Sequence, residues 1–293
     1  MFWETKITWE KLCLELELLK TEEPPSLVPL ALGIQSLLTE TIPSPSLKAL
    51  NFCCYDIDKK CDHNSTEKRL QLLNSYFFSE LDFQLLNFDN GFGHLEPWLF
   101  SYAMMNKTAA PIMASIIYAH FAKQLEIPIK LTNSDNMMIL RWERKNGNAY
   151  IDLSNKGSLH EQSEIANLYN KIKNPPIKDC EFLTPIKTQK IIKYYLQCLC
   201  KTSTSQKNLH LYLKILNMML KLDPWQAESL GERALLLKEL GYHKEAIQDL
   251  QRYFSFSDRN QAPRQIKLAY YELKAIDKDK LEMLKKHQPE NFH

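Results

Sequence analysis

Four residues close together in the N-terminal part of the chain could bind a metal ion: Cys53, Cys54, Cys61 and His63. Soft thiolates and an imidazole suit zinc, which takes about four such ligands in a structural site. Two adjacent ligands followed by a gap of six residues are not, however, a familiar zinc spacing. The alternative is that the cysteines pack as small apolar side chains. We favour packing, so the sequence predicts no metal and no other cofactor here.

A second constellation is a pair of opposite charges, Arg233 and Asp249, in a stretch that otherwise repeats apolar residues at helical spacing. Arg233 occupies a position that the surrounding pattern would bury, and an unpaired buried guanidinium is strongly disfavoured. Asp249 follows sixteen residues later, on the helix expected to face it. The pattern predicts an internal ion pair. The alternative is that Arg233 is exposed and contacts a ligand.

Catalysis by a thiol needs a cysteine, a histidine beside it and an acid that orients the histidine. No cysteine occurs between Cys61 and Cys180. His120 flanks an apolar helical stripe, which favours a partly buried structural role. His94 lies in a loop rich in asparagine and glycine, with no cysteine nearby. The sequence therefore predicts no catalytic residue.

The elements that would position such residues are clearest in the centre of the chain. Residues 111–126 begin with proline, which is favoured in a first helical turn, and repeat apolar side chains every four positions. Strand-like runs follow at 129–131, 137–142 and 149–153. The last two flank Asn146-Gly147, a dipeptide that tolerates positive φ. The pattern predicts a buried helix with an antiparallel hairpin packed on it.

The chain before this centre is mostly helical in pattern. We expect helices over 7–20, 27–39, 68–83 and from 97 to about 105, with a proline-containing loop at 41–46. The first of these segments also alternates leucine with glutamate, which a strand could share.

The C-terminal third contains a repeat-like unit over 227–258. The tetratricopeptide template, about 34 residues long, places small residues where two helices cross. Ala234 and Leu237 fit its first helix, Gly241 marks its turn, and Ala246 lies on its second helix. A further apolar helical stripe comes just before it in the chain. The pattern predicts about two helical hairpins, an architecture that points to binding.

Composition excludes several classes of protein. The 293 residues carry a formal net charge of +2, which argues against a dedicated nucleic-acid binder. Only seven glycines are present, and no glycine-rich phosphate loop occurs. The N-terminus lacks an uninterrupted apolar segment, and no apolar stretch is long enough to span a bilayer. Seven cysteines, two of them adjacent, favour free thiols in the cytoplasm.

Together these patterns predict an α+β fold that is predominantly helical, with a small antiparallel sheet followed by helical hairpins. We place a core with its N-terminal helices at 1–170 and a linker at 171–187, where two adjacent prolines occur. Helical repeats then take 188–276, and a charged tail that we expect to fray takes 277–293.

Several short stretches, in this order along the chain, resemble the SirB-type bacterial family. In the core they are a helix before the core loop, a helix start, a helix exit and a strand, at 72–78, 110–112, 125–128 and 150–152. In the C-terminal part, 232–234 is similar to Asp-Arg-Gly, and 246–253 is similar to Ala-x-x-Asp-Leu-x-x-Tyr. The resemblance runs from roughly 70 to 275. It implies a divergent member with a transglutaminase-like core followed by tetratricopeptide repeats.

In active transglutaminase-like folds, a cysteine starts the central helix, a histidine sits on the next strand and an aspartate on the strand after it. The resemblance places Pro111 at the cysteine position, Met137 at the histidine position and Asp152 at the aspartate position. Proline and methionine can be neither nucleophile nor base. The resemblance therefore implies a vestigial site in a pseudoenzyme.

The resulting expectation is a non-catalytic cytoplasmic protein that binds a protein or peptide partner, and neither nucleic acid nor a membrane. Two alternatives stay open. One is a hydrolase or acyltransferase of the transglutaminase-like superfamily with an atypical site. The other is a structural subunit of a larger complex.

Overall fold

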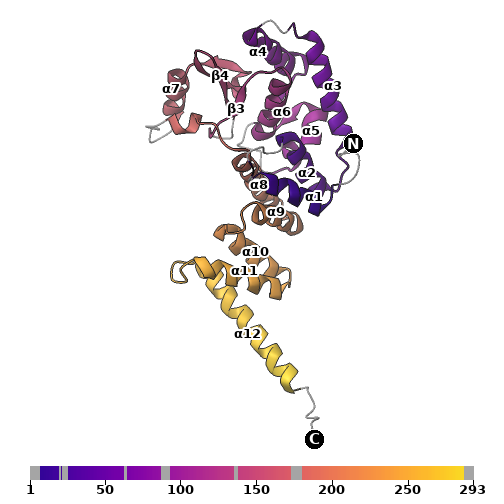
Figure 1. Cartoon of the computed structure of the whole chain (residues 1–293). Coiled ribbons are helices and arrows are strands. Elements are labelled where there is room, and N and C mark those ends of the chain that lie inside the picture. Colours follow the sequence, from indigo (N-terminus) through magenta and orange to yellow (C-terminus); the bar gives the residue numbers. More distant parts are fainter. Residues whose placement is uncertain are drawn as a thin grey trace. The chain divides into compact units, whose positions relative to one another are not determined.

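The chain divides into two units, Met1–Gln206 and Lys207–His293. The structure, a computed structural model drawn in Figure 1, describes residues 7–19, 21, 26–62, 65–86, 93–134, 138–172 and 180–286. The boundary between the units falls one helix later than the linker expected at 171–187. The reason is that the helix after this stretch packs within the first unit.

The first unit is mainly helical, and its elements within the residues that the structure describes are as follows. Its helices are α1 (Trp9–Leu18), α2 (Leu27–Thr39), α3 (Ser44–Lys60), α4 (Thr66–Ser75), the π-helix η1 (Tyr76–Glu80), the 3-10 helix η3 (Glu96–Trp98), α5 (Phe100–Asn106), α6 (Pro111–Gln124), the 3-10 helix η5 (Leu153–Asn155), α7 (Gln162–Ile172), the 3-10 helix η6 (Cys180–Leu183) and α8 (Thr188–Ser205). Its strands are β1 (Gln84–Leu85), β2 (Thr108–Ala109), β3 (Ile129–Leu131), β4 (Ile139–Arg144), β5 (Gly147–Asp152) and β6 (Ser158–His160). The predominantly helical α+β fold predicted from the sequence is confirmed.

Helix α6 forms the centre of this unit. Every residue from Pro111 to Tyr118 is buried, which is more than the one apolar stripe that the sequence predicts. The helix contacts α2, α3, α4 and α5. The ring of Phe77 meets Tyr118 and Phe121 edge-to-face, with centroids 5.3 and 6.2 Å apart. Such aromatic pairs stabilise a core beyond the area that they bury, so they fix η1 against α6.

The segment expected as one helix over 68–83 changes its winding at Tyr76. The N–H of Leu81 donates to the carbonyl of Tyr76 at 2.8 Å, the spacing of a π-helix. The wider turn brings three consecutive aromatic side chains, Tyr76, Phe77 and Phe78, into the interior.

The four-stranded antiparallel sheet has the order β3-β4-β5-β6. Strands β4 and β5 form the predicted hairpin, in which Ile139 pairs with Asp152 and Arg144 with Gly147. Gly147 has a φ of 112°, a conformation that favours glycine. Helix α6 contacts β3 and α7 contacts β5. Figure 1 shows α6 and α7 on opposite sides of the sheet.

Helix α3 corrects the expected loop at 41–46. Pro43 precedes its first residue and Pro45 lies in its first turn. The N–H groups of a first helical turn have no helical acceptor, so proline, which lacks this group, begins a helix there without cost. The two prolines that predict a loop instead mark a helix start.

The second unit consists, within the described residues, of α9 (Leu209–Leu222), α10 (Ala227–Glu239), α11 (His243–Phe256) and α12 (Arg264–Lys286). Each helix contacts the next, and α10 also contacts α12. Gly241, with a φ of 82°, lies in the turn between α10 and α11, where the sequence predicts it. Helix α12 continues to Lys286, so most of the tail expected to fray is helical.

Candidate functional site

The start of α6, where the sequence places a vestigial site, is closed by small side chains. Ala109 and Ala110 are 0% and 3% exposed, and Pro111 is buried in the first helical turn. The N–H of Ala110 donates to the carbonyl of Pro97 at 2.8 Å, and β2 pairs in parallel with β1. None of the three side chains at 109–111 carries a nucleophilic atom.

Asp152, at the end of β5, organises the turn that follows it. Its Oδ1 accepts the backbone N–H of Ser154 at 2.9 Å and the Ser154 hydroxyl at 2.5 Å. Because Asp152 pairs with Ile139, it shares a sheet face with Ile139 and Tyr150. These two residues pack with Ile165 of α7. The carboxylate therefore caps η5 on the α7 side of the sheet.

The third vestigial position, Met137, lies outside the described residues. The structure consequently shows two of the three positions, Pro111 at the head of α6 and Asp152 at the end of β5.

Strand β6 and helix α7 bring together three side chains that the sequence did not single out. Ser158 Oγ lies 2.8 Å from His160 Nε2, and His160 Nδ1 lies 3.8 Å from Oε2 of Glu164. A hydroxyl, an imidazole and an acid follow one another as in serine hydrolases. Glu164 is 61% exposed, however, and its Oε2 also accepts the N–H of Glu161 at 2.9 Å. That contact is typical of a residue that caps a helix.

The sulfur ligands considered for zinc lie on α3 and at its end. Cys53 and Cys54 are buried, Cys61 follows the last turn, and His63 is outside the described residues. Burial, with smaller contributions from Cys53 and Asp58, raises the pKa of the Cys54 thiol to about 12. A thiol binds metal as the thiolate, so Cys54 would have to release its proton before it could bind one. Within the described ranges no three His, Cys, Asp or Glu side chains form a group that could hold a metal.

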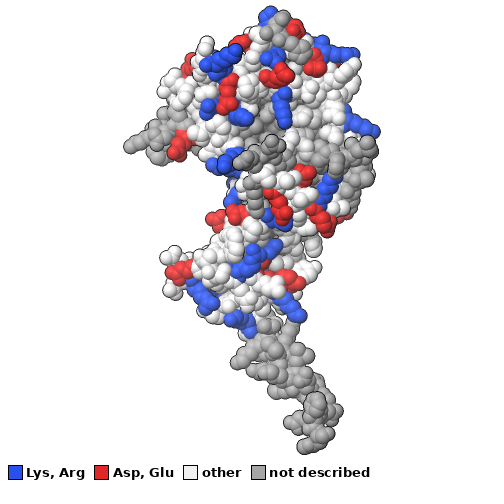
Figure 2. Space-filling model, viewed as in Figure 1, with Lys and Arg blue, Asp and Glu red and all other residues white. Residues whose placement is uncertain are grey.

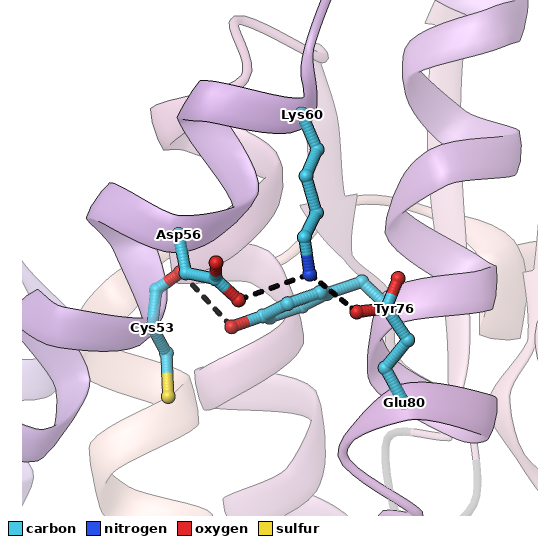
Figure 3. Close-up of polar contacts among 5 residues, drawn as sticks. All are labelled: Cys53, Asp56, Lys60, Tyr76 and Glu80. Atoms are coloured by element: carbon cyan, nitrogen blue, oxygen red, sulfur yellow. Dashed lines mark hydrogen bonds and ion pairs between the residues drawn. The ribbon is translucent and has the colours of Figure 1, made fainter.

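A polar cluster beside these cysteines joins α3 to η1 (Figure 3). Lys60 Nζ donates to Asp56 at 3.1 Å and to Glu80 at 2.5 Å. It also lies 5.0 Å from the ring centroid of Tyr76. The Tyr76 hydroxyl donates to the backbone carbonyl of Cys53 at 3.3 Å. Because these groups bind one another, the cluster holds two helices together.

A second polar chain connects α6, α4 and the turn after β5. The hydroxyl of Tyr118 donates to Asn74 Oδ1 at 2.6 Å, and Asn74 Nδ2 donates to the carbonyl of Gly157 at 2.9 Å. A Cβ atom at Gly157, whose φ is 75°, would lie 2.2 Å from Asn74 Oδ1. The chain therefore fixes the turn against the two helices. Its one sequence signal is Asn74, a polar residue inside the stretch 72–78.

In the second unit, Arg233 binds two partners. Its Nε and Nη2 donate to Asp249 Oδ2 and Oδ1, each at 2.7 Å, and its Nη1 donates to Asn217 Oδ1 at 2.8 Å. The side chains of Arg233 and Asp249 are 20% and 5% exposed. One arginine thus links α9, α10 and α11.

Surface charge is mixed in sign. On the face drawn in Figure 2, Lys and Arg lie among Asp and Glu on both units. Across the ranges that the structure describes, no helix is both long and apolar enough to cross a membrane.

Comparison with known proteins finds a matching family and a relative. The Transglutaminase-like superfamily matches residues 45–197, which run from the first turn of α3 into α8. A UPF0162 protein of Buchnera aphidicola subsp. Baizongia pistaciae (strain Bp) is 27% identical in an alignment of 164 residues, and the alignment covers 52% of this chain. The matched part spans 57% of the length of that relative. No solved structure matches the chain.

Proposed function

The chain belongs to the Transglutaminase-like superfamily. Within that family, we propose that its core is a non-catalytic scaffold that binds a protein or peptide. The observation that carries this proposal is the start of α6, where two buried alanines and a buried proline stand. A thiol enzyme needs a nucleophile, a base and an orienting acid within hydrogen-bond reach of one another. Proline has no atom that could attack a carbonyl carbon.

The other two positions support the same proposal. Met137 offers a thioether, which cannot take up a proton at physiological pH. Asp152 uses its carboxylate to cap the turn at Ser154. We therefore regard Pro111, Met137 and Asp152 as the vestige of a triad.

The buried thiols support it as well. Burial raises the pKa of Cys54 to about 12 and that of Cys198 to about 11. An activated cysteine has a pKa below its usual range, and its thiolate is accessible. Free cysteines such as these also fit a reducing compartment, and we place the protein in the cytoplasm.

For the second unit we propose tetratricopeptide-type hairpins, as in SirB-type proteins. A Cβ atom added at Gly231 would lie 3.0 Å from Cδ1 of Ile266, so α10 and α12 approach closely. Ala234 and Ala246, on α10 and α11, are buried in the same core. Small residues at helix crossings are what the repeat template requires.

A second candidate function, hydrolysis at an atypical site, has one observation in its favour. Ser158, His160 and Glu164 follow the order of a serine hydrolase triad. The capping role of Glu164 and its exposure favour the structural interpretation.

The test is a turnover assay for amine incorporation and amide hydrolysis on broad substrates. It compares the wild type with a variant in which all seven cysteines are serine and with Ser158→Ala. We expect no turnover in any of the three. Turnover that disappears without cysteine would restore a thiol enzyme, and turnover that disappears in Ser158→Ala would establish the hydrolase instead.

A further inference from the structure

A groove on the first unit lies beside the later turns of α6, away from Pro111 at the start of that helix. It is lined by the N-terminal ends of α2 and α8, by β3 and by residues 116–123 of α6. Its volume is about 870 Å³, and ligand sites typically measure roughly 300–1,000 Å³. Leu27, Ile116, Ala119 and Ile191 supply apolar lining. The groove is thus large enough for several side chains of a partner.

Among the described residues that line this groove, the charges are mainly positive. Lys123, Lys130 and Lys187 line it and are exposed to solvent. The one acidic residue among its described lining is Glu126, whose Oε2 lies 3.4 Å from Nη1 of Arg69. Exposed lysines above an apolar surface attract a ligand that carries both carboxylates and apolar groups.

The backbone adds to this positive character. Helices α2 and α8 both begin at the groove, and their N-cap residues, Ser26 and Lys187, make no side-chain cap hydrogen bond. First-turn N–H groups lack helical acceptors and carry the positive end of the helix dipole. These groups support an anionic occupant that the lysines already favour.

The volume of the groove favours a segment with several side chains over a small anion. Strand β3 is an edge of the sheet. Beside it, the N–H of Ile186 donates to the carbonyl of Leu131 at 3.1 Å, and Thr132 bridges Pro185. The outer edge of β3 thus already accepts one extended segment at its C-terminal end. The N–H of Ile129 also donates to the carbonyl of Ile127 at 2.8 Å. Because main-chain groups of β3 are used in this way, a partner segment would contact the groove mainly through its side chains.

We propose that this groove binds an acidic peptide segment of a partner protein. Its carboxylates contact Lys123, Lys130 and Lys187, and its apolar side chains lie on Ile116, Ala119 and their neighbours. The assignment rests on the proposed scaffold function and gives the chemistry of the partner.

The test uses the full chain and a labelled short peptide that alternates glutamate with leucine, with glutamine in place of glutamate as the control. Fluorescence anisotropy should show the acidic peptide binding at least about tenfold more tightly, a difference of about 1.4 kcal/mol. The affinity should fall as salt is added, because the lysines are exposed. The salt titration needs no variant, so it stays informative if a variant fails to fold.

Charge reversal locates the site. The double variant Lys123→Glu/Lys130→Glu should weaken binding about tenfold or more, since two attractions become repulsions. Lys145→Glu is the matched control, because Lys145 is exposed in the hairpin turn and does not line the groove. The NMR signals of the His120 ring should shift when the acidic peptide is added to the wild type.

Three results would overturn the assignment: equal affinity for the two peptides, equal loss in Lys145→Glu and the double variant, or His120 signals that do not move. Equally tight binding of heparin, lost in the double variant, would assign the groove to polyanions and also overturn it. None of these results bears on turnover, so the scaffold proposal would still be decided by the cysteine-free and Ser158→Ala assays.

Discussion

The guanidinium group of Arg233 binds the carboxylate of Asp249 through two parallel hydrogen bonds. Its Nε and Nη2 atoms each lie 2.7 Å from a different carboxylate oxygen. Paired contacts of this kind are among the stronger charge-assisted hydrogen bonds. Asn217 accepts from a third nitrogen of the same guanidinium. The arginine is therefore satisfied on two sides, and α9, α10 and α11 are held in one register.

Replacing Arg233 by alanine should lower the free energy of unfolding of the second unit by roughly 3–5 kcal/mol, the usual cost of removing one member of a buried pair. Asp249, which is 5% exposed, would remain buried without its partner. Hydrogen exchange of the α10 and α11 amides in increasing denaturant measures this loss.

Lys238→Ala is the control for this experiment. Lys238 pairs with Glu272 in the same unit, but the two side chains are 32% and 54% exposed. An exposed pair is worth less than about 1 kcal/mol. Similar losses in the two variants would contradict a special role for the buried pair.

The pairing of Arg233 with Asp249 could be predicted from the sequence, but the contact of Arg233 with Asn217 could not. An arginine at a position that the apolar pattern buries needs a partner of opposite charge. The helical hairpin places Asp249 on the facing helix. Asn217 lies on the preceding helix, and its position depends on how the turn between α9 and α10 sets their register. No local pattern encodes that turn geometry.

Gly157→Ala should destabilise the first unit by about 2–5 kcal/mol. Left-handed backbone costs a residue with a side chain about 1–2 kcal/mol, and the loss of a partly buried hydrogen bond adds about 1–3 kcal/mol. The new methyl group would lie 2.2 Å from Asn74 Oδ1. Asn74 cannot move aside without breaking its bonds to Tyr118 and to the Gly157 carbonyl. Denaturant unfolding followed by circular dichroism measures the change.

The double variant Asn74→Ala/Gly157→Ala separates the two costs. Removing the Asn74 side chain clears the space for the methyl group. The double variant should therefore lose less stability than the sum of the losses in the two single variants. Strictly additive losses would mean that the clash has no part in the effect.

The core shows the same limit of sequence reasoning. The hairpin β4-β5 could be predicted, because alternation and an Asn-Gly turn are local signals. Tyr118 lies 44 residues from Asn74, and Asn74 lies 83 residues from Gly157, so only the packed fold brings them together. The contact of Ser158 with His160 on a three-residue strand also lacks a periodic signal.

Stability at alkaline pH should depend on the buried thiols. Cys54 and Cys198, with folded pKa values of about 12 and about 11, hold their protons more tightly than the ordinary thiol value of 9.0. The contribution of these two thiols to the free energy of unfolding is complete below about pH 9. It is lost as the pH rises through 11 and 12, because the unfolded state releases these protons first.

Measured from pH 8 to 11, the unfolding free energy of the wild type should therefore fall more steeply than that of Cys54→Ala/Cys198→Ala. Iodoacetamide should label the two cysteines slowly in the native protein and readily in denaturant, because only the thiolate reacts. Rapid native labelling of Cys54 would show an accessible thiolate and contradict the burial.

His120 should stay neutral to lower pH than an ordinary histidine. Burial is the larger cause that lowers its pKa, and the neighbouring Lys123 is the second. Because the unfolded chain then binds the proton more readily, the contribution of His120 to stability is present above about pH 6.5 and is lost as the pH falls through its folded pKa. An NMR titration of the ring should show a midpoint below that of a model imidazole.

The two causes can be separated by substitution. Lys123→Gln should raise the pKa of His120 only part of the way, because burial remains, whereas Lys145→Gln should leave it unchanged. A bound acidic peptide should also raise it, since carboxylates beside Lys123 would favour the imidazolium form. A wild-type midpoint at the ordinary histidine value would contradict the partial burial of this ring. A full return to that value in Lys123→Gln would show instead that the charge of Lys123, rather than burial, sets the protonation of His120.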